Sequence, residues 1–497
     1  MGLAAPAAAD HTHTRSGCVP RHHAGGIVCP QGRVFRPVLA AACHGLPAGL
    51  PASAGGGGAA ERRFRSDRQD TRAARPGTAE LVTTTLPLVD ASTGYRIVPA
   101  RALLPELPAD VSAIVFHERT PVGRTIRVCA VGDTGLSGQV GRTASKLGYG
   151  ALLRDIAPLL QSAAATFANL EGTLMEHPGG PALFAAPPEA AAALRQSGVT
   201  VAHLANNHVY DFGPSGLAST LAAAAGASLL ALGAGSDAAA SQRLVRTDCG
   251  GVGVGWLGCG RTLLPQGAGA RFWEFDEQAL LGAIRKARPS VDVLIASVHI
   301  GFMYLDYPHP DHRAMAQRCA AAGADIVLMH HPHVLQGIET TPDGKIVCYS
   351  LGNFLFDWKE GLITNQVMVQ EQNEGAVFVF DLDRSGVARA AAVPTRSDES
   401  CCVRWASGDR GSAILERLLR ISRHLGGDYA AAFWRQRSER NTKHVLRMLR
   451  FYIVHGEWGS VWRMFTKVRR HHLRMLAHWA LASLRPRGSK DSHAATS

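Results

Sequence analysis

Between residues 126 and 382 the chain alternates short apolar runs with segments whose apolar residues recur at helical spacing. The short runs predict buried strands, at 127–131, 166–168, 200–204, 229–232, 252–257, 291–297, 325–329, 346–350 and 377–382. The segments with helical spacing predict helices, at 149–160, 188–196, 214–225, 278–287 and 309–322. Because strands and helices alternate, we expect an α/β fold.

The chain is less regular on both sides of this region. Residues 1–80 are mostly Ala, Gly, Arg, His and Pro with little periodicity, which predicts a disordered, low-complexity segment. Residues 412–485 contain fifteen Lys and Arg but four Asp and Glu, and Leu415, Leu418 and Leu419 have helical spacing. This pattern predicts a basic helical extension, which either packs on the core or lies on a membrane surface.

Composition narrows the class of protein. A chain of 497 residues with 46% hydrophobic residues can build a sizeable core, and its net charge of +12 indicates an anionic partner. No aromatic-basic motif of an RNA-binding module is present, so we expect no nucleic acid. The ten cysteines include no CxxC pair, which argues against a disulfide framework and a cysteine zinc site.

The sequence shows only weak signals for secretion or membrane insertion. No run of eighteen apolar residues predicts a transmembrane helix. The apolar run 38–43 follows two arginines but is too short for a signal peptide. We therefore expect a cytoplasmic or membrane-peripheral protein.

Polar side chains that can bind metal follow most of the predicted strands. They are Asp133, Asn169, Glu171, Asn207, His208, His299, His331 and His333. Each one alone has an ordinary explanation, such as a helix cap, a turn or a buried histidine. Because the carboxyl ends of strands in α/β folds meet in one crevice, we expect a shared site. Carboxylate, amide and imidazole groups together suit Mn²⁺, Fe²⁺ or Zn²⁺ better than Ca²⁺.

Five sequence blocks in order resemble the CapA family, bacterial proteins of capsule and poly-γ-glutamate biosynthesis with a metallophosphatase-like domain. The blocks are VGDTG at 131–135, NLEG at 169–172, ANNHVYDFG at 205–213, SVHIGFMY at 297–304, and HHPHVLQGIE at 330–339 followed by YSLGNFLFD at 349–357. The resemblance implies a metallophosphatase-like β-sandwich flanked by helices, which we place at 124–396.

The resemblance also implies roles for single residues. Asp133 and His333 would hold one metal ion, and Asn207, His299 and His331 a second, with Glu171 or Asp133 bridging the two. His208 would protonate the leaving group, with its ring oriented by Asp211. We assign the remaining polar residues of the blocks to substrate binding, namely Asn169, Asn206, Tyr304, His330 and Asn353.

Three positions depart from the motifs. Gly135 stands where the metallophosphatase pattern Asp-x-His has a histidine ligand after Asp133, so the number of metal ions stays open. Met303 stands in place of a glutamate before Tyr304, so the choice of substrate stays open. Met329 stands in place of a glycine.

These observations lead to two functional hypotheses. The first is a divalent-metal-dependent hydrolase that acts on a phosphoester or a γ-glutamyl amide in cell-envelope polymer metabolism, with an anionic polymer or a phosphorylated compound as substrate. The alternative is a non-catalytic accessory protein that binds metal and polymer in a membrane-associated complex for capsule synthesis or export.

Overall fold

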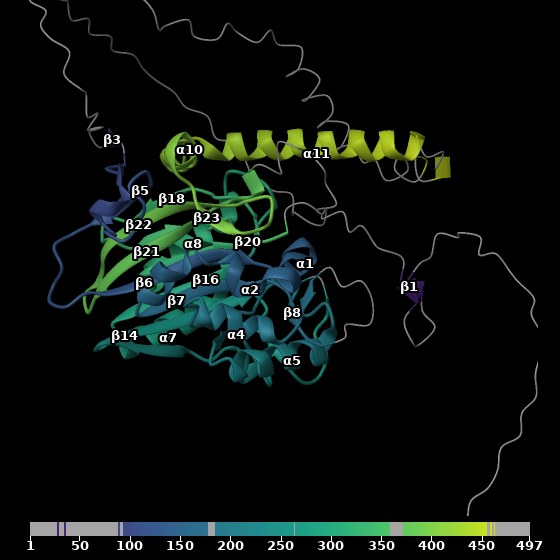
Figure 1. Cartoon of the computed structure of the whole chain (residues 1–497), viewed down its shortest axis with the longest axis horizontal. Coiled ribbons are helices and arrows are strands. Elements are labelled where there is room, and N and C mark those ends of the chain that lie inside the picture. The colour runs from purple at the N-terminus through teal and green to yellow at the C-terminus, as the bar shows by residue number, and fades with distance from the viewer. Residues whose placement is uncertain are drawn as a thin grey trace, which may run out of the picture. The chain divides into compact units, whose positions relative to one another are not determined.

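Two mixed β-sheets form the centre of the unit Thr83–Ser497 (Figure 1). The computed structural model describes residues 27–28, 34–35, 88–89, 93–176, 184–262, 264–357, 371–454, 458–459 and 462, without the side chains of 27–28, 34–35, 88–89 and 443–453. The predicted disordered segment 1–80 lies outside the described residues, apart from the short strands β1 (Ile27–Val28) and β2 (Val34–Phe35).

The larger sheet has eleven strands in the order β11-β10-β7-β6-β21-β22-β5-β4-β3, with β20 beside β6 and β23 beside β22. Its strands are β3 (Leu88–Val89), β4 (Arg96–Pro99), β5 (Ser112–Glu118), β6 (Ile126–Thr134), β7 (Ala165–Leu170), β10 (Val201–His203), β11 (Leu230–Leu232), β20 (Asn353–Leu355), β21 (Glu374–Asp383), β22 (Gly386–Ser397) and β23 (Val403–Trp405). Strands β11, β10, β7, β6 and β20 run parallel to one another, so their carboxyl ends lie at the same edge.

The smaller sheet has six strands in the order β13-β14-β16-β17-β19-β18. They are β13 (Val245–Cys249), β14 (Val252–Gly260), β16 (Val293–His299), β17 (Ile326–His330), β18 (Ile338–Thr340) and β19 (Ile346–Cys348). The four strands β14, β16, β17 and β19 are parallel. Two small pairs complete the strands, β8 (Thr173–Leu174) with β9 (Ala185–Ala186) and β12 (Ala234–Gly235) with β15 (Arg271–Phe272).

Helices cover the outer faces of the two sheets. They are α1 (Gly138–Leu147), α2 (Tyr149–Leu152), α3 (Ala157–Ser162), α4 (Glu189–Gln196), α5 (Gly213–Gly226), α6 (Ala238–Ser241), α7 (Glu277–Ala287), α8 (Pro310–Ala322), α10 (Gly408–Leu425) and α11 (Tyr429–Val454), with 3-10 turns at Ala100–Ala102 and Arg288–Ser290. Among the described residues, none of these helices combines the length and the apolar character that a bilayer-spanning segment needs.

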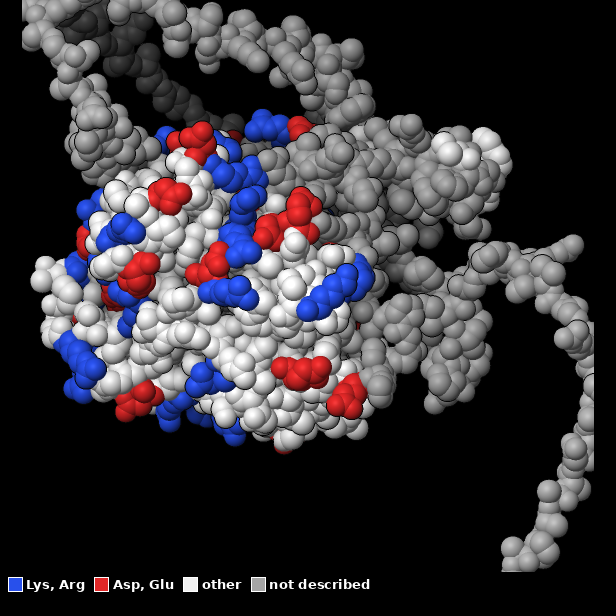
Figure 2. Space-filling view, in the orientation of Figure 1, with Lys and Arg blue, Asp and Glu red and all other residues white. Residues whose placement is uncertain are grey.

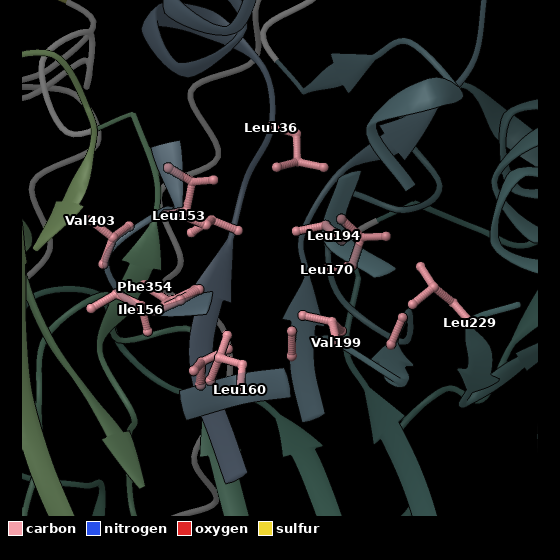
Figure 3. Close-up of a cluster of buried hydrophobic side chains, with 14 of the residues drawn as sticks. Leu136, Leu153, Ile156, Leu160, Leu170, Leu194, Val199, Leu229, Phe354 and Val403 are labelled. Atoms are coloured by element: carbon pink, nitrogen blue, oxygen red, sulfur yellow. The ribbon is translucent and has the colours of Figure 1, made fainter. Parts of the chain in front are cut away.

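The side chains of each central strand alternate between two cores. In β7, Phe167 belongs to the core between the sheets, whereas Ala168 belongs to the core beneath α1–α5. Part of the core beneath α1–α5 is drawn in Figure 3. A third core lies on the other side of the smaller sheet, where Leu294 and Val298 meet Ile284 of α7. The expected α/β fold, a β-sandwich flanked by helices, is therefore confirmed.

The packed body extends on both sides of the predicted 124–396 domain. Strands β4 and β5 join the larger sheet before it, and α10 packs after it. Helix α10 places Leu415 and Leu418 in the core between the sheets and Ile421 in the third core. This part of the basic extension therefore packs on the core, whereas most residues after Val454 lie outside the described part of the chain.

Gly260 marks a close contact between the two sheets at the edge where the parallel strands end. A Cβ atom at Gly260 would lie 1.8 Å from the carbonyl oxygen of Ala205, just before the loop that carries Asn206 and Asn207. In the strand register, Gly260 is paired with His299. The missing side chain lets the Asn207 loop and His299 approach each other.

We predict that Gly260→Ala lowers the free energy of unfolding by about 1–3 kcal/mol, because the added methyl group must displace backbone. Gly282→Ala is the matched control, since Gly282 lies in α7 with open space around it. That control should raise stability by up to about 1 kcal/mol through helix propensity. Thermal unfolding measures both variants. Equal melting temperatures for Gly260→Ala and the wild type would contradict the proposed contact.

Candidate metal centre

The strand register brings the predicted ligands together at the carboxyl ends of the parallel strands. Asp133 of β6 is paired with Asn169 of β7, and His299 of β16 is paired with His330 of β17. Glu171 follows β7 directly, and Asn207 and His208 lie in the loop after β10. The structure therefore places the predicted residues around one site, although they span two sheets.

The loop after β17 holds its histidines in a strained conformation. His331 and His333 have φ values of 96° and 57°, and Tyr304 in the neighbouring loop has a φ of 63°. Left-handed backbone in residues other than glycine costs about 1–2 kcal/mol each. The two loops support each other, because the Tyr304 N–H donates to the Pro332 carbonyl oxygen at 2.7 Å. Strain of this kind is typical of functional loops that the surrounding structure holds in place.

The carboxylate of Glu171 is buried without a hydrogen-bond partner among the described residues. It is 1% exposed, and within the described residues neither of its oxygens makes a hydrogen bond. Its Oε1 lies 3.9 Å from His208 Nε2, 3.9 Å from His299 Nε2 and 3.7 Å from His333 Nε2. These distances are too long for hydrogen bonds. They are close to the roughly 3.5 Å that separates ligand atoms each about 2.0–2.2 Å from one ion.

Two groups of candidate ligands overlap at Glu171. One consists of Glu171, His299 and His331, and the other of Asp133, Glu171 and His333; in each, the ligand atoms lie within 4.8 Å of one another. Asn207 adds an oxygen to the first group, since its Oδ1 lies 2.7 Å from His299 Nε2. This is the division into two positions that the resemblance implies, with Glu171 common to both.

Two of the histidines are held neutral. Burial, together with the neighbouring His333, lowers the pKa of His331 to about 3. Burial and the neighbouring His331 keep the pKa of His299 well below its usual value. A neutral imidazole offers a free lone pair, which is the form that binds a metal ion.

Glu171 and His333, by contrast, have raised pKa values. Burial raises the pKa of Glu171 to about 8. Burial alone would lower the pKa of His333, but the charges of Glu171 and Asp133 outweigh it and raise that pKa to about 9. For Asp133, the nearby His330 and His333 outweigh burial and hold the pKa well below its usual value. At neutral pH the site therefore carries protons that a bound cation would replace.

His208 lies at the opening of the site, with 22% of its side chain exposed. Its Nδ1 lies 2.8 Å from Asp211 Oδ2, as predicted for an oriented ring. The ring of Phe184 stacks on it with centroids 3.5 Å apart. A second aromatic ring, Phe356, lies 4.7 Å from that of His333. The sequence analysis assigned neither phenylalanine. Phe356 lies within the GNFLFD block, but no motif surrounds Phe184.

Four of the five predicted substrate-binding residues are buried behind the ligands. Asn169 donates to Asp133 Oδ1 at 2.8 Å, and its Nδ2 lies 3.1 Å from His299 Nδ1. Asn353 Oδ1 lies 3.0 Å from His333 Nδ1. Asn206 accepts hydrogen bonds from the backbone of the His208 loop, and His330 stacks on the buried Phe167. Contacts of this kind orient the ligands. Tyr304 is the fifth, and it is partly exposed at 6.1 Å from the His333 ring.

Comparison with known proteins agrees with these motifs. The family model described as "Bacterial capsule synthesis protein PGA_cap" matches residues 127–358. The "Capsule biosynthesis protein CapA" of Bacillus anthracis is 27% identical over 343 residues, which cover 64% of this chain and 79% of that protein. The "PGA biosynthesis protein CapA" of Bacillus subtilis (strain 168) is 30% identical over 211 residues, which cover 41% of this chain and 53% of that protein.

Among solved structures, the calcineurin-like phosphoesterase YfkN from Bacillus subtilis matches 61% of this chain and 98% of its own, with a TM-score of 0.32 and 14% identity. This structural similarity is too low to support a family assignment. The assignment rests instead on the family model, the relatives and the chain's own geometry. The matched residues 127–358 contain every metal ligand described above. The family model and these relatives therefore confirm the resemblance to the CapA family of bacterial capsule synthesis proteins, over residues 127–358 of this chain.

Proposed function

We propose that this protein is a divalent-metal-dependent hydrolase that acts on a phosphoester or a γ-glutamyl amide in cell-envelope polymer metabolism. The observation that supports it best is the Glu171 carboxylate, which is buried without a hydrogen-bond partner among the imidazoles of His208, His299 and His333. A buried carboxylate is costly unless it is paired or coordinates a metal ion. The substrate would be an anionic polymer or a phosphorylated compound.

The donor set fits a transition metal. Asp133, Glu171 and His333 would hold one ion, and Glu171, His299, His331 and Asn207 a second. Mixed carboxylate and imidazole donors suit Mn²⁺, Fe²⁺ or Zn²⁺. When bound, such ions supply a Lewis acid that polarises the scissile group and stabilises charge on its oxygens.

The chain's own residues would handle the leaving group and the substrate oxygens. His208 is bound to Asp211 through Nδ1, so its Nε2 is the atom available to pass a proton to a leaving group. Phe184 covers one face of that ring and limits contact with water. Burial and the charge of Glu171 raise the pKa of Tyr304 to about 12, so its hydroxyl keeps its proton and can donate to a substrate oxygen.

We also propose that the basic extension associates with an anionic membrane surface. Trp434, Trp458 and Trp462 are 44%, 64% and 71% exposed. Attraction to anionic lipid is worth about 1 kcal/mol for each Lys or Arg near the surface. The protein should sediment with phosphatidylserine vesicles but not with phosphatidylcholine vesicles at low salt, and truncation after residue 454 should weaken the association. Equal sedimentation with both kinds of vesicle would contradict this proposal.

We predict that the protein takes up at least one Mn²⁺, Fe²⁺ or Zn²⁺ ion. His331→Ala and His333→Ala should each weaken binding at least 10- to 100-fold, because each removes a ligand. Elemental analysis and calorimetric titration measure this. His117→Ala is the matched control, since His117 lies on β5 and its Nε2 contacts the Val387 carbonyl oxygen.

The same titration should depend on pH. The metal displaces protons from Glu171 and His333, whose pKa values are raised to about 8 and 9. Affinity should therefore rise as the pH increases from 6 to 9, and binding at pH 7 should release protons. Absence of metal uptake by the wild type, or an equal loss in His117→Ala, would contradict the assignment.

We predict that His208→Ala retains its metal but loses about 10²–10⁴-fold in turnover on an alkyl phosphate, whose leaving group needs a proton. An aryl phosphate with an acidic phenol should show a much smaller deficit. Asp133→Asn should lose both metal and turnover. If His208→Ala keeps full activity on the alkyl ester or loses its metal, His208 is not the general acid. A wild-type protein that binds metal but hydrolyses neither phosphoesters nor γ-glutamyl amides would favour the non-catalytic alternative.

A further inference from the structure

A groove on the larger sheet lies outside the residues that match the family model. It encloses about 450 Å³ and is lined by Arg396, Arg404, Trp405, Ser407 and Arg410. These residues come from the ends of β22 and β23 and the start of α10. In Figure 2, basic side chains form a band over the region where Figure 1 labels β22, β23 and α10.

The strand register places two arginines side by side in this groove. Arg396 is paired directly with Arg404 across β22 and β23, and with Glu374 on its other side. The Glu374 carboxylate, however, pairs with Arg410 and Arg417 of α10. Arg404 is held by Asp155 at 2.8 Å and by Asp398 at 3.2 Å. Within the described residues the Arg396 side chain makes no hydrogen bond or ion pair.

This arrangement is unfavourable for an empty surface but suits an anion. Like charges directly opposite each other on neighbouring strands are destabilising. Arg404 is oriented by its two ion pairs, and its guanidinium has five N–H donors, more than those pairs use. The planar forks of arginine match carboxylate and phosphate groups. Trp405 is fixed by its indole N–H, which donates to the Asp155 carbonyl oxygen at 3.1 Å, and it provides an apolar wall.

We propose that this groove binds the carboxylate or phosphate groups of a chain-shaped anion. Gly375, Thr395 and Trp405 are successive neighbours across β21, β22 and β23, and Gly352, just before β20, is the neighbour of Gly375. Three steps of about 4.8 Å place the groove roughly 14 Å from Gly352. The next residue, Asn353, contacts His333 of the metal centre. A polymer with repeated charges is long enough to span this separation, whereas a small anion is not.

The test is binding of fluorescently labelled oligomers to the full-length protein at low salt. A γ-glutamate oligomer presents carboxylates, a short polyphosphate presents phosphates, and a glutamine oligomer is the uncharged control. Arg396→Gln should weaken binding of the preferred anionic oligomer three- to tenfold, and Arg396→Gln with Arg404→Gln at least tenfold. Arg396→Lys should fall between the wild type and Arg396→Gln, because it keeps the charge but loses the fork.

Arg246→Gln is the matched control, because Arg246 is also an exposed strand arginine and lies on β13 of the other sheet. It should bind as the wild type does. An equal loss in Arg246→Gln and Arg396→Gln, or no loss in Arg396→Gln, would overturn the proposal. The idea that one polymer chain reaches both the groove and the metal centre depends on the proposed function. Binding of an anion at the groove does not. Asp133→Asn should therefore keep the groove's affinity even if the metal centre has another role.

Discussion

The burial of two carboxylates in one small volume is the constraint on which the rest of this site depends. Asp133 and Glu171 are each 1% exposed or less, and both lie close to His333. Charges placed this way are expensive unless positive partners balance them. The raised pKa values of Glu171 and His333 favour protonation of this pair at neutral pH, and a divalent cation can replace the protons. The neutral His299 and His331 then complete the set of donors.

The fold supplies the rigidity that this arrangement requires. Each ligand lies at or just after the end of a strand that is buried on both faces. The site also joins two sheets, so it depends on the core between them and on close backbone contacts such as the one at Gly260. The strained backbone at His331 and His333 is tolerated because neighbouring loops and Asn353 hold both residues in place. The C-terminal helices strengthen the same region, since Gln436 of α11 accepts a hydrogen bond from the backbone of Asp306, close to Tyr304.

Much of this could be predicted from the sequence, because the strands that carry the ligands are short and apolar and end in distinctive polar residues. Strands β5 and β22 were not predicted, since their place depends on pairing between residues far apart in the chain. The predicted helix 149–160 is divided into α2 and α3, because the chain turns at Arg154 and Asp155. The pattern of residues along the chain also could not predict which polar side chains are buried. Asn169 and His330 are buried, whereas Tyr304 is partly exposed. The arginine groove has no motif, because its residues come together only through strand register.

The central claim is that Glu171 is shared by two groups of metal ligands. The most direct test is metal content and affinity in Glu171→Gln, which keeps the size of the side chain but removes its charge. The account predicts that this single change weakens metal binding at every position of the centre by at least tenfold, while the protein remains folded. Metal uptake by Glu171→Gln with wild-type stoichiometry and affinity would contradict it.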